Sequence, residues 1–157
     1  MRATRQISSA EPYQRDLPLP GGGLIARGEG REVVLNEYGV VVNGAEVLFC
    51  PHPRKSWQGC KPAEIELCCV PGGWAWAVSY QFTNQGMGSP LMPFSDRQVL
   101  KQTRGDAIAA AVEQLELGIE SYHKVHRPCA ESRAAVNWLR SLIAATSANR
   151  QAGGLFG

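Results

Sequence analysis

The chain has 157 residues, of which 44% are hydrophobic and 19% are charged, and its net charge is +2. This length is enough for one domain with a single core, and the composition excludes a chain that is disordered throughout. So small a net charge does not by itself indicate a nucleic acid or an anionic membrane as partner, and no stretch approaches the roughly 18 apolar residues of a membrane span.

Residues 1–22 are predicted to form a flexible N-terminal arm, because three prolines interrupt the segment and glycines end it. A single α+β domain is expected over residues 23–146. Its first part is rich in short β-branched segments. Two of them, Val40–Val42 and Glu46–Phe49, flank Asn43-Gly44. Because Asn-Gly favours a type I′ turn, the sequence predicts a β-hairpin at this point.

The loop at residues 50–62 contains three prolines and a basic cluster around one aromatic ring. Its candidate binding residues are Arg54, Lys55, Trp57 and Lys61. Cationic side chains can contact phosphates while a tryptophan stacks on a base. The alternative interpretation is ordinary surface charge.

An aromatic strand follows the turn Pro71-Gly72-Gly73. Bulky side chains recur at every second position from Trp74 to Phe82, with small or polar residues between them. Such a stripe can stack bases if it is exposed, as in nucleic-acid-binding sheets. Burial under a helix is the favoured interpretation, because large apolar patches are rare on the surface of monomers.

The segment at residues 83–93 is rich in glycine and proline, which predicts a mobile loop leading into a short edge strand near Pro93-Phe94. Met87 in this loop is a further candidate contact. Three basic candidates lie before or at the start of the next helix: Arg97, Lys101 and Arg104.

Two helices are predicted in the C-terminal part. Thr103 can cap the first, and Pro128 ends it. Its core stripe at helical spacing consists of Ile108, Val112, Leu115, Ile119 and Tyr122. The second is expected from about Ala130 to Thr146, followed by a flexible tail over residues 147–157. The predicted fold is therefore α+β: an antiparallel sheet of about five strands with two C-terminal helices packed on one face.

The cysteines indicate the compartment. There are five, an odd number, and no apolar segment typical of a secretory signal follows the N-terminal arginines. Reduced thiols in a cytoplasmic protein are therefore expected. Cys68 and Cys69 are neighbours in a strand and point to opposite faces, so they should not pair with each other.

No catalytic motif emerges from the sequence. It lacks a nucleophile elbow, and its Gly86-x-Gly88 lacks the Gly-Lys-Ser/Thr that completes a phosphate-binding loop. We expect no catalytic residue, no cofactor and no metal. The weaker alternative is a zinc protein or an enzyme built on His123, His126 and Cys129, but these residues lack the paired C-x-x-C spacing of a structural zinc site.

Two resemblances bear on function. The block from Ile65 to Leu117, with its Gly-Gly-Trp turn, Gly-Ser-Pro-Leu loop and Thr-Arg-Gly-Asp-Ala-Ile helix start, resembles small uncharacterised proteins of bacterial phages and plasmids. This resemblance implies a cytoplasmic accessory protein of a mobile element that works by binding. The segment Gln151–Phe156 resembles the bacterial sliding-clamp-binding peptide, with one extra residue.

The leading hypothesis is a non-enzymatic protein that binds a host protein or nucleoprotein complex that handles nucleic acid. Such a protein can inhibit a defence system, as anti-CRISPR and anti-restriction proteins do. The alternative is a protein that binds single-stranded DNA or RNA through Trp57 and the basic loop.

Overall fold

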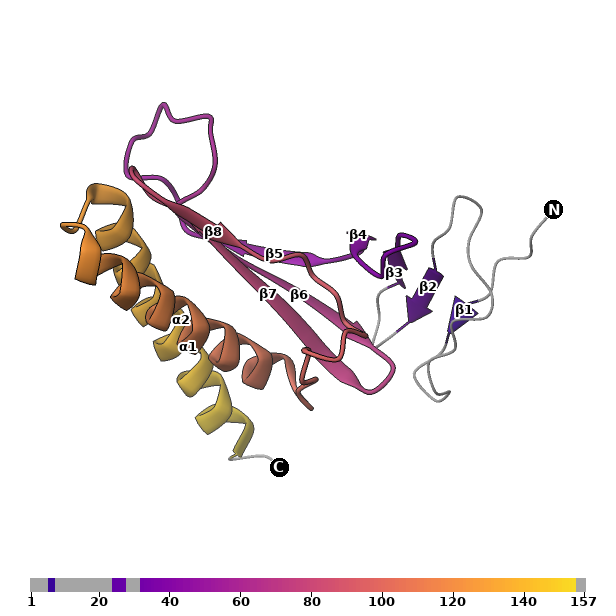
Figure 1. The fold of residues 1–157 in the computed structure, drawn as a ribbon. Coiled ribbons are helices and arrows are strands. Elements are labelled where there is room, and N and C mark those ends of the chain that lie inside the picture. Colours follow the sequence, from indigo (N-terminus) through magenta and orange to yellow (C-terminus); the bar gives the residue numbers. More distant parts are fainter. Residues whose placement is uncertain (1–5, 8–23, 28–31, 155–157) are drawn as a thin grey trace. The chain divides into compact units, whose positions relative to one another are not determined.

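The computed structural model describes residues 6–7, 24–27 and 32–154. Within these residues the α+β class and the two C-terminal helices are confirmed (Figure 1). The helices are α1 (Arg104–Val125) and α2 (Ala130–Gly154). The strands are β1 (Gln6–Ile7), β2 (Leu24–Arg27), β3 (Glu32–Leu35), β4 (Val41–Asn43), β5 (Glu46–Phe49), β6 (Ala63–Val70), β7 (Gly73–Gln81) and β8 (Gly86–Gly88).

The described strands form two sheets of four strands, where one sheet of about five is predicted. The first has the order β1-β2-β3-β4 and the second has the order β5-β6-β7-β8. Gln6–Ile7, which fall within the predicted N-terminal arm, pair with β2 in parallel. The rest of the arm up to residue 22 lies outside the described residues.

The tight turn of the first sheet lies between β3 and β4. The side-chain oxygen of Asn36 accepts hydrogen bonds from the amides of Tyr38 and Val40, at 2.9 and 3.0 Å, and Gly39 adopts a φ of 80°. An asparagine that bonds to the backbone two residues ahead, followed by a glycine with positive φ, is a strong turn signal. This turn allows β4 to return antiparallel to β3.

The predicted hairpin at Asn43-Gly44 is wrong, because β4 and β5 belong to different sheets. Gly44 does adopt a positive φ of 91°, but its role is a close backbone approach. A Cβ at this position would collide with the carbonyl oxygen of Glu32. Asn43-Gly44 therefore lies where the chain leaves the first sheet and enters the second.

The chain divides into two compact units. The first comprises Met1–Val47, Glu66–Ala77 and Pro90–Ala107, and the second comprises Leu48–Ile65, Val78–Ser89 and Ile108–Gly157. Strands β5, β6 and β7 and helix α1 each contribute residues to both units.

The core of the first unit buries the small face of β7. Ala75 and Ala77 pack there with residues of β3 and β6, namely Val33, Leu35, Cys68 and Val70, and with Leu91. Trp74 and Trp76, predicted to be core residues, are only half-buried. The backbone of Trp74 pairs with Lys101 through two hydrogen bonds of 2.7 and 2.9 Å. The small side chains of Ala75 and Ala77 let the residues of β3 and Leu91 pack closely against this face of β7. The large side chains on the other face would keep such residues farther away.

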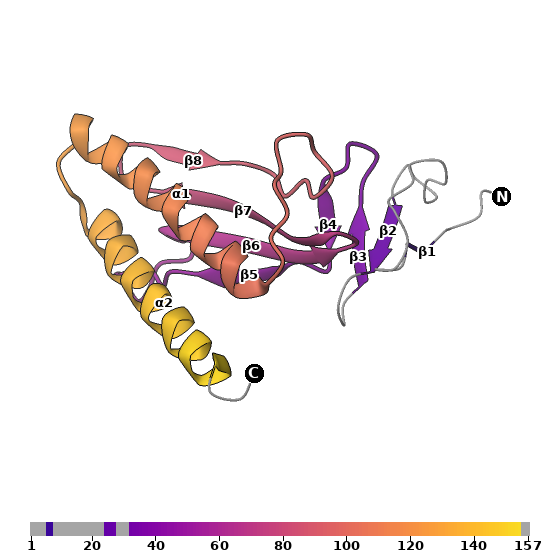
Figure 2. The same ribbon diagram turned by 90° about the horizontal axis from the view of Figure 1, so that it is seen from below.

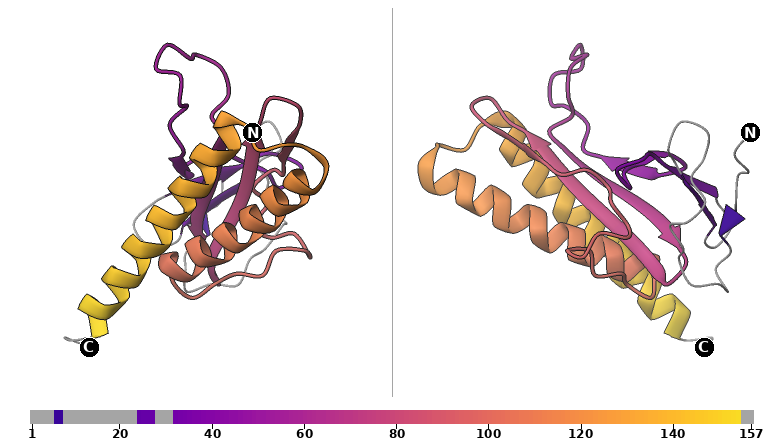
Figure 3. Two further views of the ribbon diagram at one scale, coloured as in Figure 1. Left: turned by 90° about the vertical axis from the view of Figure 1, so that its left-hand side faces the viewer. Right: turned by 45° about the vertical axis from the view of Figure 1, so that its right-hand side comes forward.

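In the second unit the predicted helical stripe is confirmed. Every member from Ile108 to Tyr122 is buried. The rings of Tyr80 and Phe82 stack with centroids 4.4 Å apart, and Tyr122 meets Phe82 edge-on at 4.9 Å. The bulky end of the aromatic strand is therefore buried under α1, as predicted. Both helices lie side by side on one face of the sheet (Figures 2 and 3).

Each helix begins at a side-chain cap. The predicted cap of α1 is confirmed, since the amide of Asp106 donates to the hydroxyl of Thr103 at 3.1 Å. In α2 the amide of Ser132 donates to the sulfur of Cys129 at 3.4 Å, and the amide of Cys129 donates to the hydroxyl of Ser132 at 2.9 Å. This is a reciprocal capping box in which cysteine takes the usual place of serine or threonine.

The second helix is longer than predicted. It continues to Gly154, well beyond the expected end near Thr146. The segment that resembles a clamp-binding peptide therefore begins inside this helix, and its Leu155-Phe156 lies outside the described residues.

Candidate binding surface

The loop at residues 50–62, here called the Trp57 loop, leaves the sheet between β5 and β6 (Figure 1). At its base the amide of Cys50 donates to the carbonyl of Ala63 at 2.9 Å. The indole of Trp57 stacks on the imidazole of His52, with ring centroids 4.4 Å apart and an interplanar angle of 12°. Its ring nitrogen donates to the carbonyl of Cys60 at 2.9 Å.

Trp57 is thus held in one orientation although it stays 40% exposed. Arg54 and Lys55, on the same turn, are both exposed. The amide of Trp57 donates to the carbonyl of Arg54 at 3.0 Å. This hydrogen bond closes the turn that carries both the aromatic ring and the cation. Binding to a pre-ordered side chain costs less conformational entropy than binding to a mobile one.

His52 anchors this loop to the first turn of α2. Its Nδ1 accepts a hydrogen bond from the amide of Arg54 at 3.0 Å, so Nε2 is left to face the carboxylate of Glu131 at 3.5 Å. The His52 side chain is only 8% exposed. The other carboxylate oxygen of Glu131 accepts a hydrogen bond from the hydroxyl of Thr83 at 3.0 Å. Sequence reasoning missed this anchor, because Glu131 lies nearly 80 residues away in the chain.

The carboxyl group of Glu131 has a pKa below its ordinary value. A hydrogen bond from its own backbone amide is the main cause, and bonds from Cys129 and Thr83 and the charge of His52 add to it against the opposing effect of burial. Because its pKa is lower in the folded state, the charged carboxylate of Glu131 stabilises the fold. This contribution is complete above the ordinary pKa of 4.5 and is lost as the pH falls through the folded-state pKa.

Glu131→Gln should therefore destabilise the protein at pH 7 by about 1 kcal/mol, the size of a helix-terminus charge interaction in a partly buried setting. As the pH falls below 4.5 and through the lowered folded-state pKa, the two proteins should converge in stability, because the wild-type carboxyl becomes protonated too. Urea unfolding over a series of pH values from 7 downward measures this convergence. A stability gap that stays constant over the whole series would show that the charge has no part in it.

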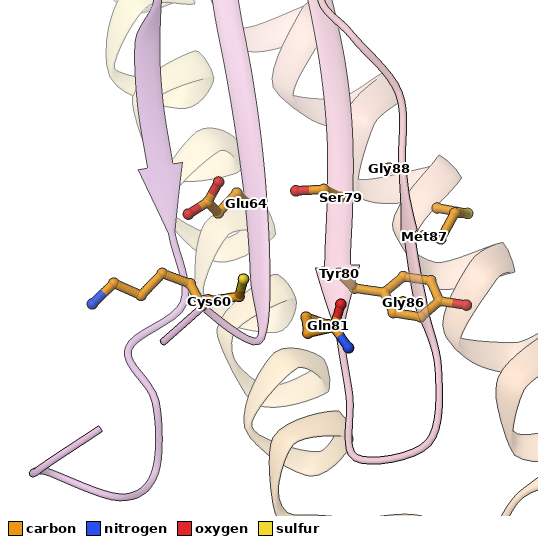
Figure 4. Close-up of a pocket in the computed structure, with 9 residues that line it drawn as sticks. Cys60, Glu64, Ser79, Tyr80, Gln81, Gly86, Met87 and Gly88 are labelled. Atoms are coloured by element: carbon orange, nitrogen blue, oxygen red, sulfur yellow. The ribbon is translucent and has the colours of Figure 1, made fainter. Parts of the chain in front are cut away.

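A polar depression of about 540 Å³ adjoins the Trp57 loop (Figure 4). Cys60 and Lys61 line it from the loop, and Glu64 and Ser79 line it from β6 and β7. Tyr80 and Met87 also border it, although their side-chain ends pack near Gly118 of α1. Because alternate side chains of a strand point to opposite faces, the depression lies on the face away from α1.

Two glycines of β8 explain why this depression is open. Gly86 pairs with Gln81, and Gly88 pairs with Ser79. A Cβ at Gly88 would lie 3.2 Å from the Cβ of Ser79, on the side of the depression. The edge strand is therefore Gly86–Gly88, not the predicted one near Pro93-Phe94.

Met87, predicted to be a contact on a flexible loop, lies in β8 opposite Tyr80 and is half-buried. A Cβ at Gly118 of α1 would lie 3.4 Å from the Met87 methyl group, so the side chain packs against the helix. Period-two alternation places Met87 on the helix side whenever Gly86 and Gly88 face the depression. Its predicted place on a flexible loop is therefore wrong, and its role as a binding contact stays a prediction.

Half-buried Lys61 and exposed Phe49 form a second group at the base of the Trp57 loop. The ammonium of Lys61 lies 4.8 Å from the centroid of the Phe49 ring, and this ring is 47% exposed. Sequence reasoning misses Phe49 as a surface residue because it lies in the predicted hairpin. The available signal was the pair Val47 and Phe49, two apolar residues that share one face of β5.

The remaining predicted basic residues belong to the first unit. Arg97 is exposed, and the ammonium of Lys101 lies 5.8 Å from the ring of Trp76. Arg104 forms an ion pair with Glu46, with Nε donating to a carboxylate oxygen at 2.9 Å. The structure thus brings Arg54, Lys55, Trp57 and Lys61 together in one unit, and it engages Arg104 in a bond within the protein.

The three residues of the zinc alternative gather around Tyr122. The Nε2 atom of His123 lies 3.0 Å from the hydroxyl of Ser132, and the ring of His126 is tilted against Tyr122 at 4.8 Å. The hydroxyl of Tyr122 donates to the sulfur of Cys129 at 3.7 Å. In the part of the chain that the structure describes, no group of three or more histidine, cysteine or acidic residues is placed to hold a metal.

The cysteines, all free, divide by environment. Burial raises the pKa of Cys50 to about 11 and that of Cys68 to about 12, so both are poor nucleophiles at neutral pH. Burial also raises the pKa of Cys129, but hydrogen bonds from Ser132, Thr83 and Tyr122 outweigh it and leave this pKa below its ordinary value.

Comparisons with protein-family models, with curated protein sequences and with solved structures found no match to this chain. Among the helices that the structure describes, none combines the length and the apolar character that crossing a bilayer requires.

Proposed function

We propose that this protein is a non-enzymatic binding protein that uses the Trp57 loop to engage a complex that handles nucleic acid. The observation that carries the proposal is the fixed and exposed indole of Trp57 beside two exposed cations, Arg54 and Lys55. Tryptophan and arginine are the residue types most enriched at binding hot spots, and tyrosine is the third. A basic surface favours an acidic partner and speeds its association.

The proposed biological setting is a cytoplasmic accessory protein of a phage or plasmid. It rests on the resemblance of the Ile65–Leu117 block. In this setting the protein occupies a functional surface of a host complex and inhibits it, as an anti-CRISPR or anti-restriction protein does. The positive charge of the Trp57 loop suits a surface of that complex on which nucleic acid is already bound.

An affinity pull-down from bacterial lysate tests this function. The wild-type chain is compared with Arg54→Ala/Lys55→Ala/Trp57→Ala, with and without nuclease treatment. The wild type should recover a defined partner complex, and the triple variant should recover at least tenfold less, because truncation of hot-spot residues typically costs 2 kcal/mol or more.

Lys124→Ala/Arg127→Ala is the matched control. It removes two exposed positive charges from the end of α1 and the segment after it, so it tests net charge without touching the loop. Recovery of the same partner in equal amount by the triple variant would refute the assignment of this surface. Arg97→Ala/Lys101→Ala, tested in parallel, measures the contribution of the first unit.

A further inference from the structure

The segments that form the Trp57 loop and the depression hold an excess of positive charge. Leu48–Ile65 and Val78–Ser89 together contain three lysine or arginine residues and one carboxylate, that of Glu64. This excess of two equals the net charge of the whole chain. Nearby Glu131 is already engaged by His52 and Thr83. The electrostatic potential around these segments is therefore positive and attracts a polyanion.

Two exposed aromatic rings lie among these cations. Trp57 is held flat against His52, and Phe49 has Lys61 above its ring. Surfaces that bind single strands combine cations for the phosphates with aromatic faces for unstacked bases, because every base has a π face. A duplex keeps its bases stacked and cannot use such rings in this way.

The depression is polar and large enough to hold one base. Its volume of about 540 Å³ lies within the range of small-ligand pockets. Ser79 and Gln81 offer a hydroxyl and an amide, and Glu64 offers an acceptor. These are the groups that read the edge of an unpaired base. The glycines of β8 leave the depression open.

The Trp57 loop and the depression form one continuous surface. Cys60 holds the indole of Trp57 through its carbonyl oxygen and also lines the depression. We infer that this surface binds single-stranded nucleic acid directly, with one base stacked on Trp57, a neighbouring base in the depression and the phosphates along Arg54, Lys55 and Lys61. This inference rests on the proposed function and names the component of the partner complex that the loop contacts.

Fluorescence anisotropy with labelled oligonucleotides tests the inference. The probes are 12-residue oligothymidylate and oligouridylate, and a 12-base-pair duplex serves for comparison. Single strands should bind, and log K should fall with log salt concentration with a slope of about −2, from three cations at roughly 0.7 each. The two single-stranded probes distinguish DNA from RNA as the preferred form.

Each part of the surface has its own variant. Trp57→Ala should weaken binding by about 5- to 150-fold, the loss expected for one stacked base, whereas Trp57→Phe should retain most of the affinity. Arg54→Ala/Lys55→Ala should make the salt slope shallower by about 1.4. Ser79→Ala/Gln81→Ala should weaken binding without changing the slope. Lys124→Ala/Arg127→Ala should leave affinity and slope unchanged.

Three results would overturn the inference. They are the absence of binding to either single strand at 50 mM salt by folded protein, equal affinity for the duplex, and a salt slope that Arg54→Ala/Lys55→Ala does not alter. Competition by polyglutamate as strong as by the oligonucleotide would assign the surface to an acidic protein instead. If the pull-down still recovers a nuclease-resistant partner through the Trp57 loop, the proposed function survives this failure; if that partner is also absent, both fail.

Discussion

Gly73→Ala is expected to destabilise the protein by about 3 kcal/mol or more. Gly73 adopts a φ of 140°, which other residues rarely adopt, and a Cβ there would collide with the carbonyl oxygen of Lys101. That carbonyl accepts the 2.7 Å hydrogen bond from the amide of Trp74. Relieving the collision would therefore separate β7 from the segment that pairs with it, and backbone strain would add to the lost bonds.

Chemical denaturation of the wild type and the variant measures this loss. Gly39→Ala is the matched control, because Gly39 also has a positive φ, of 80°, but a Cβ there would meet open space. The control should lose only the cost of the backbone conformation, about 1 kcal/mol. Equal losses in the two variants would show that the contact with Lys101 has no energetic weight.

Tyr122→Ala is expected to cost about 3–5 kcal/mol, the range for truncating a large aromatic side chain in a core. Tyr122 is 2% exposed and meets the rings of Tyr80 and Phe82 edge-on, with centroids 6.4 and 4.9 Å away. Its removal leaves a cavity between α1 and β7 in the second unit. Tyr122→Phe keeps the ring contacts and should cost about 1 kcal/mol or less, the net value of one hydrogen bond.

The same conservative variant should change the chemistry of Cys129. The Tyr122 hydroxyl is one of the groups that lower the pKa of this thiol, so Tyr122→Phe should raise it. The pH dependence of alkylation, measured in a Cys60→Ser background that removes the exposed cysteine, reports this shift. Buried Cys50 and Cys68 should stay silent at neutral pH. An unchanged alkylation profile would mean that the hydroxyl does not interact with the sulfur.

Local signals located most elements of this protein correctly. The stripe from Ile108 to Tyr122 predicts one buried face of α1, and Thr103 predicts its start, because both depend only on helical periodicity and on capping within one turn. The aromatic strand and the basic loop are also visible in the sequence. These features depend on neighbours at most a few residues away.

Other features depend on which segments meet in space. Asn43-Gly44 carries a strong hairpin signal, yet β4 and β5 go to different sheets, because β4 pairs with β3 and Gly44 passes close to Glu32. Met87 looks exposed in sequence until the pairing of β8 with β7 turns it toward α1. Pairing partners decide both outcomes, and local propensity does not encode them.

The candidate surface shows the same division. The order of residues by itself determined that a tryptophan and several cations share one loop of an α+β protein. Only the tertiary structure decided that His52 and Glu131 hold this loop in place, that Phe49 joins it, and that the glycines of β8 open a polar depression beside it. The physical reason is that a loop has no periodicity of its own, so its conformation is set by long-range contacts with elements far away in the chain.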